Sequence, residues 1–134
     1  MKLSSKTIAA LKMFIDLGEH YEDGYVSLVD VAKRKDVSKK FLEQIVPLYK
    51  AAGLLLCSRG NQGGYRLAKE AKDISLHEIL ILSESFLQKE RMEDAVIESA
   101  IEGLDEAISS YLEGVRLSSL VSKQKEEYIN SYMI

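Results

Sequence analysis

Apolar residues recur at helical spacing in several separate stretches of this chain. The first stretch predicts a helix from Ser4 or Ser5 to about His20. Its apolar side follows Ile8, Leu11, Phe14 or Ile15, and Gly18. A shorter second helix is predicted after Ser27, which with Asp30 forms a capping box ahead of Leu28, Val31 and Ala32. Both helices have one apolar side, so we expect them to share a core.

A third helix is predicted from Ser38, a capping residue, to about Ala52, with Gly53 as its left-handed stop. One side is apolar and comprises Phe41, Leu42, Ile45, Leu48, Tyr49 and Ala52. The opposite side comprises Lys40, Glu43, Gln44, Pro47 and Ala51. Pro47 removes one backbone bond, so we expect a kink there.

A hairpin is predicted next, because residues 54–58 form an apolar run too short for a helix and residues 65–67 can pair with it. Three glycines near its tip, Gly60, Gly63 and Gly64, allow positive φ angles. Arg59 and Arg66 flank the tip. The pattern therefore predicts a cationic finger that projects into solvent.

A helix with an open polar face followed by a hairpin with a basic tip is typical of a winged helix-turn-helix, a mainly α fold. Such a helix fits the major groove of DNA, which is roughly 12 Å wide. Amides pair with adenine, lysine with guanine and carboxylates with cytosine. The candidates for contact with base edges are Lys39, Lys40, Glu43 and Gln44. The two lysines have an alternative role, in which they contact phosphates alone.

The second half of the chain contains a short helix and a long one. Ser75 and Glu78 form a capping box for a helix that closes the winged domain. From about Met92, heptad spacing predicts a long helix whose wide apolar stripe is most simply buried against a second copy. The stripe is Ile97, Ile101, Leu104, Ile108, Tyr111 and Val115.

Glycines and a polar tail divide this second half further. Gly103 permits close helix approach or breaks the long helix in two, and the sequence leaves both open. Gly114 predicts a stop, and the tail from Lys123 is polar enough to fray, although its aromatic and apolar residues could dock. We expect a DNA-binding domain over residues 1–85, and a dimerisation helix with a tail over residues 86–134.

Several motifs together resemble the Rrf-two family of bacterial transcription regulators, of the IscR, NsrR and CymR type. They are Met1-Lys2-Leu3-Ser4, Val26-Ser27-Leu28, Phe41-Leu42-Glu43-Gln44-Ile45, Ala52-Gly53-Leu54, Arg59-Gly60, Gly63-Gly64-Tyr65-Arg66-Leu67-Ala68 and Ile74-Ser75-Leu76. The match keeps one register over more than half of the chain. It implies a homodimer that reads two half-sites of a palindromic operator, and it favours a repressor.

The resemblance also implies roles for the wing. Arg59 corresponds to the family's wing arginine and is expected to enter the minor groove. Asn61, Gln62 and Tyr65 are expected to contact the DNA backbone, and Tyr65 has the alternative of packing between wing and core.

The family's best-known sensors hold an iron–sulfur cluster on three cysteines between the fourth helix and the dimer helix. That interval here, residues 88–104, contains neither cysteine nor histidine. We therefore expect no iron–sulfur cluster and no other cofactor. Cys57 is predicted to pack in the core, with a reactive thiol as the minority alternative. His20 and His77 are isolated and are predicted at the surface or at helix ends.

Charge is divided unevenly along the 134 residues, whose net charge is −3. Residues 1–72 carry 13 Lys and Arg against 8 Asp and Glu, whereas the remainder carries 5 against 13. The cationic half coincides with the predicted DNA-binding unit. With 46% hydrophobic residues, short apolar runs and one cysteine, the sequence predicts a cytoplasmic protein without a membrane segment or disulfide.

Catalysis has little support, because the sequence contains no Walker loop, no paired histidine and nucleophile, and no metal-ligand spacing. The chain is thus predicted to be a regulator and not an enzyme. One alternative is a regulator controlled by a protein partner or an unknown small effector, with the acidic half as the candidate surface. Another is a dimeric adaptor that binds no DNA.

Overall fold

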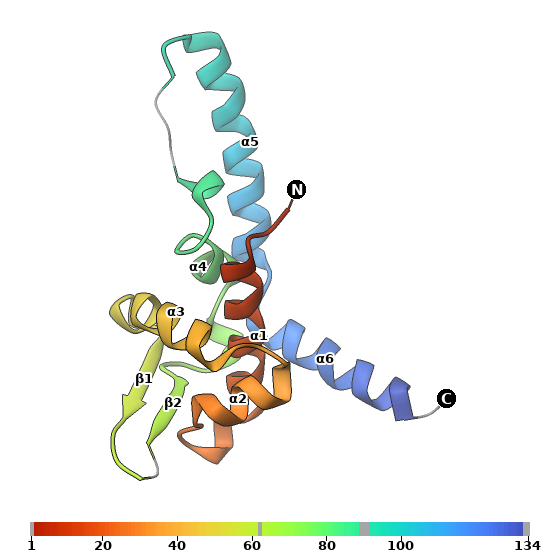
Figure 1. The fold of residues 1–134 in the computed structure, drawn as a ribbon. Coiled ribbons are helices and arrows are strands. Elements are labelled where there is room, and N and C mark those ends of the chain that lie inside the picture. Colours follow the sequence, from red (N-terminus) through yellow and green to blue (C-terminus); the bar gives the residue numbers. More distant parts are fainter. Residues whose placement is uncertain (1, 62, 89–91, 133–134) are drawn as a thin grey trace.

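The computed structural model describes residues 2–61, 63–88 and 92–132 (Figure 1). Helices make up most of it, and one antiparallel hairpin projects from the body. In chain order the helices and strands are α1 (Ser5–Glu19), α2 (Leu28–Lys35), α3 (Lys39–Ala51), β1 (Leu55–Ser58), β2 (Gly64–Leu67), α4 (Leu76–Leu80), α5 (Ala95–Gly114) and α6 (Leu117–Tyr132). Short 3-10 turns lie at Tyr21–Asp23, Ala71–Asp73 and Ser85–Leu87. The predicted winged helix-turn-helix with a long C-terminal helix is confirmed.

The core is built around α1, whose Met13, Phe14 and Leu17 are buried. Phe14 meets Tyr49 of α3 edge to face, with ring centroids 5.0 Å apart. Such a pair contributes about 0.5–1.5 kcal/mol beyond its buried area. The Tyr49 hydroxyl donates to the carbonyl of Ile79 at 3.2 Å. These contacts fix α3 between α1 and α4, so its opposite face is left open.

Hydroxyl caps define where the helices of the winged domain begin. Ser4, Ser27, Ser38 and Ser75 each accept a bond from a backbone N–H in the first turn of the helix that follows. Each such cap stabilises its helix by about 1 kcal/mol. The capping box predicted at Ser75 and Glu78 is complete, since Glu78 also accepts from the Ser75 N–H at 2.8 Å.

Two of the three hairpin glycines serve a different purpose from the positive φ angles that were predicted. Among these three glycines, all of which lie in the described residues, Gly60 alone has positive φ, at 107°. Gly63 and Gly64 are required by close packing of backbone. A Cβ on Gly63 would lie 2.6 Å from the Ser58 carbonyl oxygen, and one on Gly64 would lie 2.3 Å from the Val26 carbonyl oxygen.

The C-terminal half consists of two long helices. Helix α5 is continuous through Gly103, so this glycine does not break the long helix in two. The tail does not fray as predicted, because residues up to Tyr132 continue α6, which packs on α1. Figure 1 shows α5 extending away from the winged domain and α6 leaving it in another direction. None of the helices in the described ranges is long and apolar enough to cross a membrane.

Candidate nucleic-acid interface

Helix α3 presents one continuous polar face to solvent. Ser38 caps its start by accepting from the Phe41 N–H at 3.2 Å. Its buried side holds Leu42, Ile45 and Tyr49. The four residues predicted to reach base edges, Lys39, Lys40, Glu43 and Gln44, are all exposed on the other side. The helix continues through the exposed Pro47 to Ala51.

Lys39 and Glu43 are joined by an ion pair one helical turn apart, with Nζ and Oε1 separated by 3.1 Å. Both side chains are about half exposed, so water screens the pair. Exposed pairs of this spacing contribute only about 0.3–0.5 kcal/mol. Either side chain can therefore leave its partner for a phosphate or a base edge at little cost.

The wing places its basic tip beyond the sheet. In the hairpin Leu55 pairs with Leu67, Leu56 with Arg66, Cys57 with Tyr65, and Ser58 with Gly64. Arg59 and Asn61 follow at the tip, and both are exposed. The predicted contact Gln62 lies outside the described residues. Arg59 is thus free of the core and accessible to a partner.

Tyr65 and Cys57 lie where the wing approaches α3. Both side chains are half-buried, and Tyr65 packs against the core. Cys57 is therefore outside the fully buried core, contrary to its predicted place. Burial raises the pKa of Tyr65, and the neighbouring Cys57 and Glu43 raise it further. Helix α3 packs against β1, so the base of the wing lies beside α3.

Arg66 does not belong to the cationic finger that the sequence suggested. Its Nη2 donates to the Tyr21 carbonyl oxygen at 3.3 Å. Its guanidinium carbon also lies 5.0 Å from the Tyr21 ring centre and 5.7 Å from that of Tyr25. The side chain is half-buried by these contacts. Of the two arginines that flank the tip, Arg59 is therefore the exposed one.

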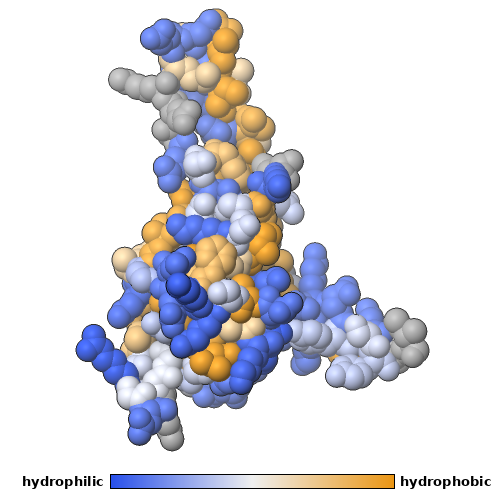
Figure 2. Space-filling view, viewed as in Figure 1, coloured by the Kyte–Doolittle hydropathy of each residue, from blue (hydrophilic) through white to orange (hydrophobic). Residues whose placement is uncertain are grey.

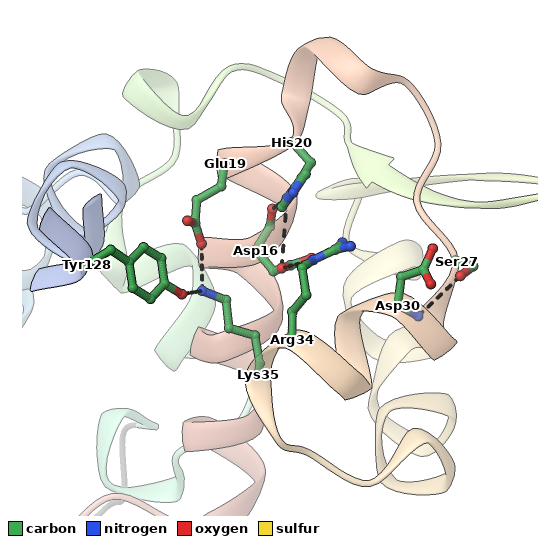
Figure 3. A network of polar contacts seen from close by, with 8 residues as sticks. All are labelled: Asp16, Glu19, His20, Ser27, Asp30, Arg34, Lys35 and Tyr128. Carbon is green, nitrogen blue, oxygen red and sulfur yellow. Dashed lines mark hydrogen bonds and ion pairs between the residues drawn. The ribbon is translucent and has the colours of Figure 1, made fainter. Parts of the chain in front are cut away.

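Two other cations of the basic half are paired with carboxylates of α1 (Figure 3). Arg34 of α2 donates to both oxygens of Asp16 at 2.8 and 2.9 Å, and Asp16 is completely buried. The hydrogen bonds from Arg34 to Asp16 raise the pKa of Arg34. His20 ends α1, with its Nδ1 2.8 Å from the Asp16 carbonyl oxygen, as expected for a residue at a helix end.

The second pair connects three helices. Lys35 ends α2, and its Nζ donates to Glu19 of α1 at 2.6 Å and to the Tyr128 hydroxyl of α6 at 3.0 Å (Figure 3). Burial alone would lower the pKa of Lys35, but the bonds to Glu19 and Tyr128 raise it overall. Neither pair was predicted from the sequence. The available signal was Asp16, a carboxylate between Phe14 and Leu17 on the apolar side of α1.

Helix α5 exposes apolar side chains along much of its length. Exposure is 48% for Ile97, 41% for Ile101, 55% for Leu104 and 70% for Tyr111. Figure 2 shows a band of hydrophobic residues, in orange, along one side of α5. The other two predicted stripe residues, Ile108 and Val115, are half-buried, and Ile108 packs against the core of its own chain. The stripe thus contacts the core of its own chain at Ile108, whereas most of its other side chains are open to solvent.

Comparison with known proteins agrees with this architecture. The model of the Rrf2 family, described as "Iron-dependent Transcriptional regulator", matches residues 3–123. The chain belongs to the Rrf2 family of transcriptional regulators. Its relatives are regulators and not enzymes.

Individual relatives cover nearly the whole Rrf2 chain. The regulator IscR of Yersinia enterocolitica is 29% identical over 133 residues, which is 92% of this chain and 81% of the relative. The structure of T. potens IscR has a TM-score of 0.79 at 31% identity and covers 95% of this chain and 90% of that one. CymR of B. subtilis, titled a global cysteine regulator, has a TM-score of 0.78 at 31% identity, with coverage of 92% and 98%.

The donor atoms of this Rrf2 chain do not fit an iron–sulfur cluster held by its own thiolates. Its single cysteine, Cys57, lies on β1 of the wing. Clusters of this kind are usually held by several cysteine thiolates. In the described part of the chain, no three His, Cys, Asp or Glu side chains are grouped to hold a metal ion. The iron dependence in the family's description therefore has no matching set of ligands here.

Proposed function

We propose that this Rrf2 regulator is a homodimer that binds a palindromic operator through α3 and the wing, without an iron–sulfur cluster, and represses transcription. The observation that carries the proposal is the proximity of two features, the open polar face of α3 and the base of the exposed wing. Helix α3 packs against β1 of the wing. The side chains of Glu43 on α3 and Arg59 on the wing are both exposed.

The role proposed for each residue on DNA follows from the chemistry and position of its side chain. Lys39, Lys40, Glu43 and Gln44 are exposed at the N-terminal end of α3, the end that reads base edges in helix-turn-helix proteins. Arg59 is proposed to enter the minor groove beside them, where a narrow groove attracts arginine. Asn61 is exposed at the same tip and suits a backbone contact, and the same role is proposed for Gln62 and Tyr65.

The homodimer is supported by the open stripe of α5. Ile97, Ile101 and Leu104 cannot be covered by the described residues of their own chain, because they are exposed in it. Burying them gains about 25 cal/mol for each Å² of apolar surface. Two copies joined here would present two α3 helices to two half-sites.

The proposed domains are residues 1–85 for DNA binding and residues 86–134 for dimerisation and the tail. In this division α6 returns from the dimerisation part to pack on α1. We propose repression because a dimer that occupies an operator within a promoter would exclude the polymerase. The signal that controls binding is proposed to be a small effector or protein partner, since the chain lacks the cluster thiolates.

The test is selection of bound sequences from random duplex DNA by purified, metal-free protein, with Arg59→Ala as the control. We expect a palindromic consensus with half-sites about one DNA turn apart, roughly 34–36 Å. Arg59→Ala should enrich it much more weakly. Absence of enrichment by the wild-type protein would overturn the proposal and would favour an adaptor, or a regulator that needs a partner.

A further inference from the structure

The hairpin is fastened to the body along the edge of β2 that faces away from β1. Val26, in the connection between α1 and α2, donates its N–H to the Tyr65 carbonyl at 2.8 Å and accepts from the Tyr65 N–H at 2.8 Å. Gly64 permits this approach, because a Cβ there would lie 2.3 Å from the Val26 carbonyl oxygen. The base of the wing is therefore held by a segment that lies outside the hairpin.

Arg66 reinforces the same attachment through its side chain. The guanidinium lies over two rings of the α1–α2 connection, at 5.0 Å from the centre of Tyr21 and 5.7 Å from the centre of Tyr25. It also donates to the Tyr21 carbonyl oxygen. A planar cation can stack on aromatic faces, whereas a lysine ammonium lacks this plane. We call the contacts among Arg66, Tyr21 and Tyr25 the wing clamp.

The wing clamp lies on the connection that ends in the Ser27 cap of α2. It thereby ties β2 to the helix-turn-helix that carries α3. The wing tip has no such attachment in the described residues other than through its two strands. The angle between the tip and the outer face of α3 therefore depends on how firmly β2 is held at its base.

We propose that Arg66 is a positioning residue that sets the wing against α3, and that it does not contact DNA. This inference rests on the proposed DNA-binding function and deepens it. Charge alone would assign Arg66 to the phosphates, as it does Arg59. In the wing clamp the charge of Arg66 instead interacts with two tyrosine rings and a carbonyl oxygen. Arg66 therefore affects DNA affinity indirectly, by fixing the position of Arg59.

Arg66→Lys separates the two roles because it keeps the charge and removes the planar stack. We expect affinity for the selected operator to fall about 5- to 10-fold, with Arg66→Gln giving a similar loss. In an Arg59→Ala background, the same Arg66 substitutions should change affinity less than about 2-fold, since coupled residues are not additive. The positioning role of Arg66 would be overturned if Arg66→Lys bound the operator with wild-type affinity and the loss in Arg66→Gln were additive with that of Arg59→Ala.

The tyrosines supply the matched controls. Tyr21→Ala combined with Tyr25→Ala leaves Arg66 in place and should lower affinity as Arg66→Lys does. Tyr21→Phe combined with Tyr25→Phe keeps both rings and should restore wild-type affinity. If Arg66 contacted phosphate, the alanine variant would bind as the wild type does. Thermal unfolding of each variant would identify any that fail to fold, and in that case the comparison of Arg66→Lys in the wild-type and Arg59→Ala backgrounds remains decisive.

A measurement without DNA keeps this inference separate from the proposed function. Hydrogen exchange at the Val26 and Tyr65 amides reports the base of the wing directly, because these groups bond to each other. We expect faster exchange in Arg66→Lys and in the alanine variant, and wild-type exchange in the phenylalanine variant. Unchanged exchange in all variants would overturn the clamp, whereas failure of the wild-type protein to bind DNA would overturn only the proposed function.

Discussion

Helices α3 and α5 each leave one whole face uncovered, but the two faces differ in chemistry. The open face of α3 carries Lys39, Lys40 and Glu43, which remain hydrated at no cost. The open face of α5 carries Ile97, Ile101 and Leu104, whose exposure to water is unfavourable. A polar face can stay exposed to solvent until a charged partner binds. The apolar face is unfavourable in water unless another surface covers it, so we propose that α3 contacts DNA and α5 contacts protein.

The two faces also depend on each other. If α5 pairs two protomers, the distance between the two α3 helices is fixed by the body that connects α3 to α5. That body is rigid where α3 is held, since Tyr49 contacts both Phe14 of α1 and Ile79 of α4. Substitutions on the open face of α5 should therefore alter dimerisation, whereas substitutions on the open face of α3 should alter DNA contacts. The two effects can be measured separately.

The largest effect is expected from Leu104→Asp on α5. Each dimer would lose two buried leucine side chains, worth about 1.5–3 kcal/mol each, and would bury two carboxylates. The dimer dissociation constant should rise by about 100-fold or more in sedimentation experiments. The protomer should stay folded because Leu104 is exposed in it.

Glu113→Gln supplies the matched control for this variant. Glu113 is also exposed on α5 but lies away from the apolar stripe, so its replacement should leave the dimer intact. A Leu104→Asp protein that still sedimented as a dimer would remove α5 from the interface.

The next largest effect is expected from Arg59→Ala at the wing tip. Loss of a minor-groove arginine should weaken operator binding by about 10- to 30-fold at matched salt. The slope of log affinity against log salt should become shallower by about 0.9 for the one phosphate charge no longer neutralised. Sedimentation should show an unchanged dimer. Operator affinity equal to that of the wild type would exclude the wing from the complex.

A smaller effect, on specificity more than affinity, is expected from Glu43→Gln on α3. One base-edge contact discriminates by about 1–3 kcal/mol, so preference at one operator position should relax. Binding to unrelated DNA should increase slightly because Lys39 loses its ion-pair partner. Competition with operators altered one position at a time measures both quantities. Glu126→Gln, at an exposed site on α6, should change neither.

The smallest expected effect is a pH dependence of stability. It reports folding of the winged domain and arises from a residue that lies on neither of the two open faces. Burial alone would raise the pKa of Glu78, but its bonds to Lys69 and to the Ser75 N–H lower it overall. A carboxyl with a lowered folded-state pKa stabilises the protein above its unfolded pKa, and that contribution is lost as pH falls through the folded value.

Glu78→Gln should therefore cost about 0.5–1 kcal/mol of stability at pH 7. The difference from wild type should narrow as pH falls from about 5 to 3, as measured by urea unfolding. A difference that stays constant over this range would contradict the ionised role of Glu78.

Local patterns were sufficient to predict the helices, the hairpin and the family. The capping serines, the Gly53 stop and the heptad stripe are signals within a few residues of the element that they define. The exposure of Arg59 and of the outer face of α3 followed from the same patterns.

Long-range pairings were not predictable from the sequence. Arg66 follows the wing tip in sequence, so it was interpreted as part of a cationic finger, yet its partners are 41 to 45 residues away on the α1–α2 connection. The polar composition of the tail suggested fraying and left docking of its aromatic residues as the alternative; Tyr128 does dock, on Lys35, 93 residues away in the sequence. Composition indicates the charges of a segment but does not indicate which of them the fold neutralises.

The measurement that tests the account most directly is operator affinity as a function of half-site spacing, for wild-type protein and for Leu104→Asp. A dimer fixed by α5 should lose about 100-fold or more in affinity when five base pairs, half a DNA turn, are inserted between the half-sites. Leu104→Asp, with its half-sites bound independently, should be insensitive to the insertion. Wild-type affinity that did not change with spacing would contradict the claim that α5 sets the geometry with which α3 reads DNA.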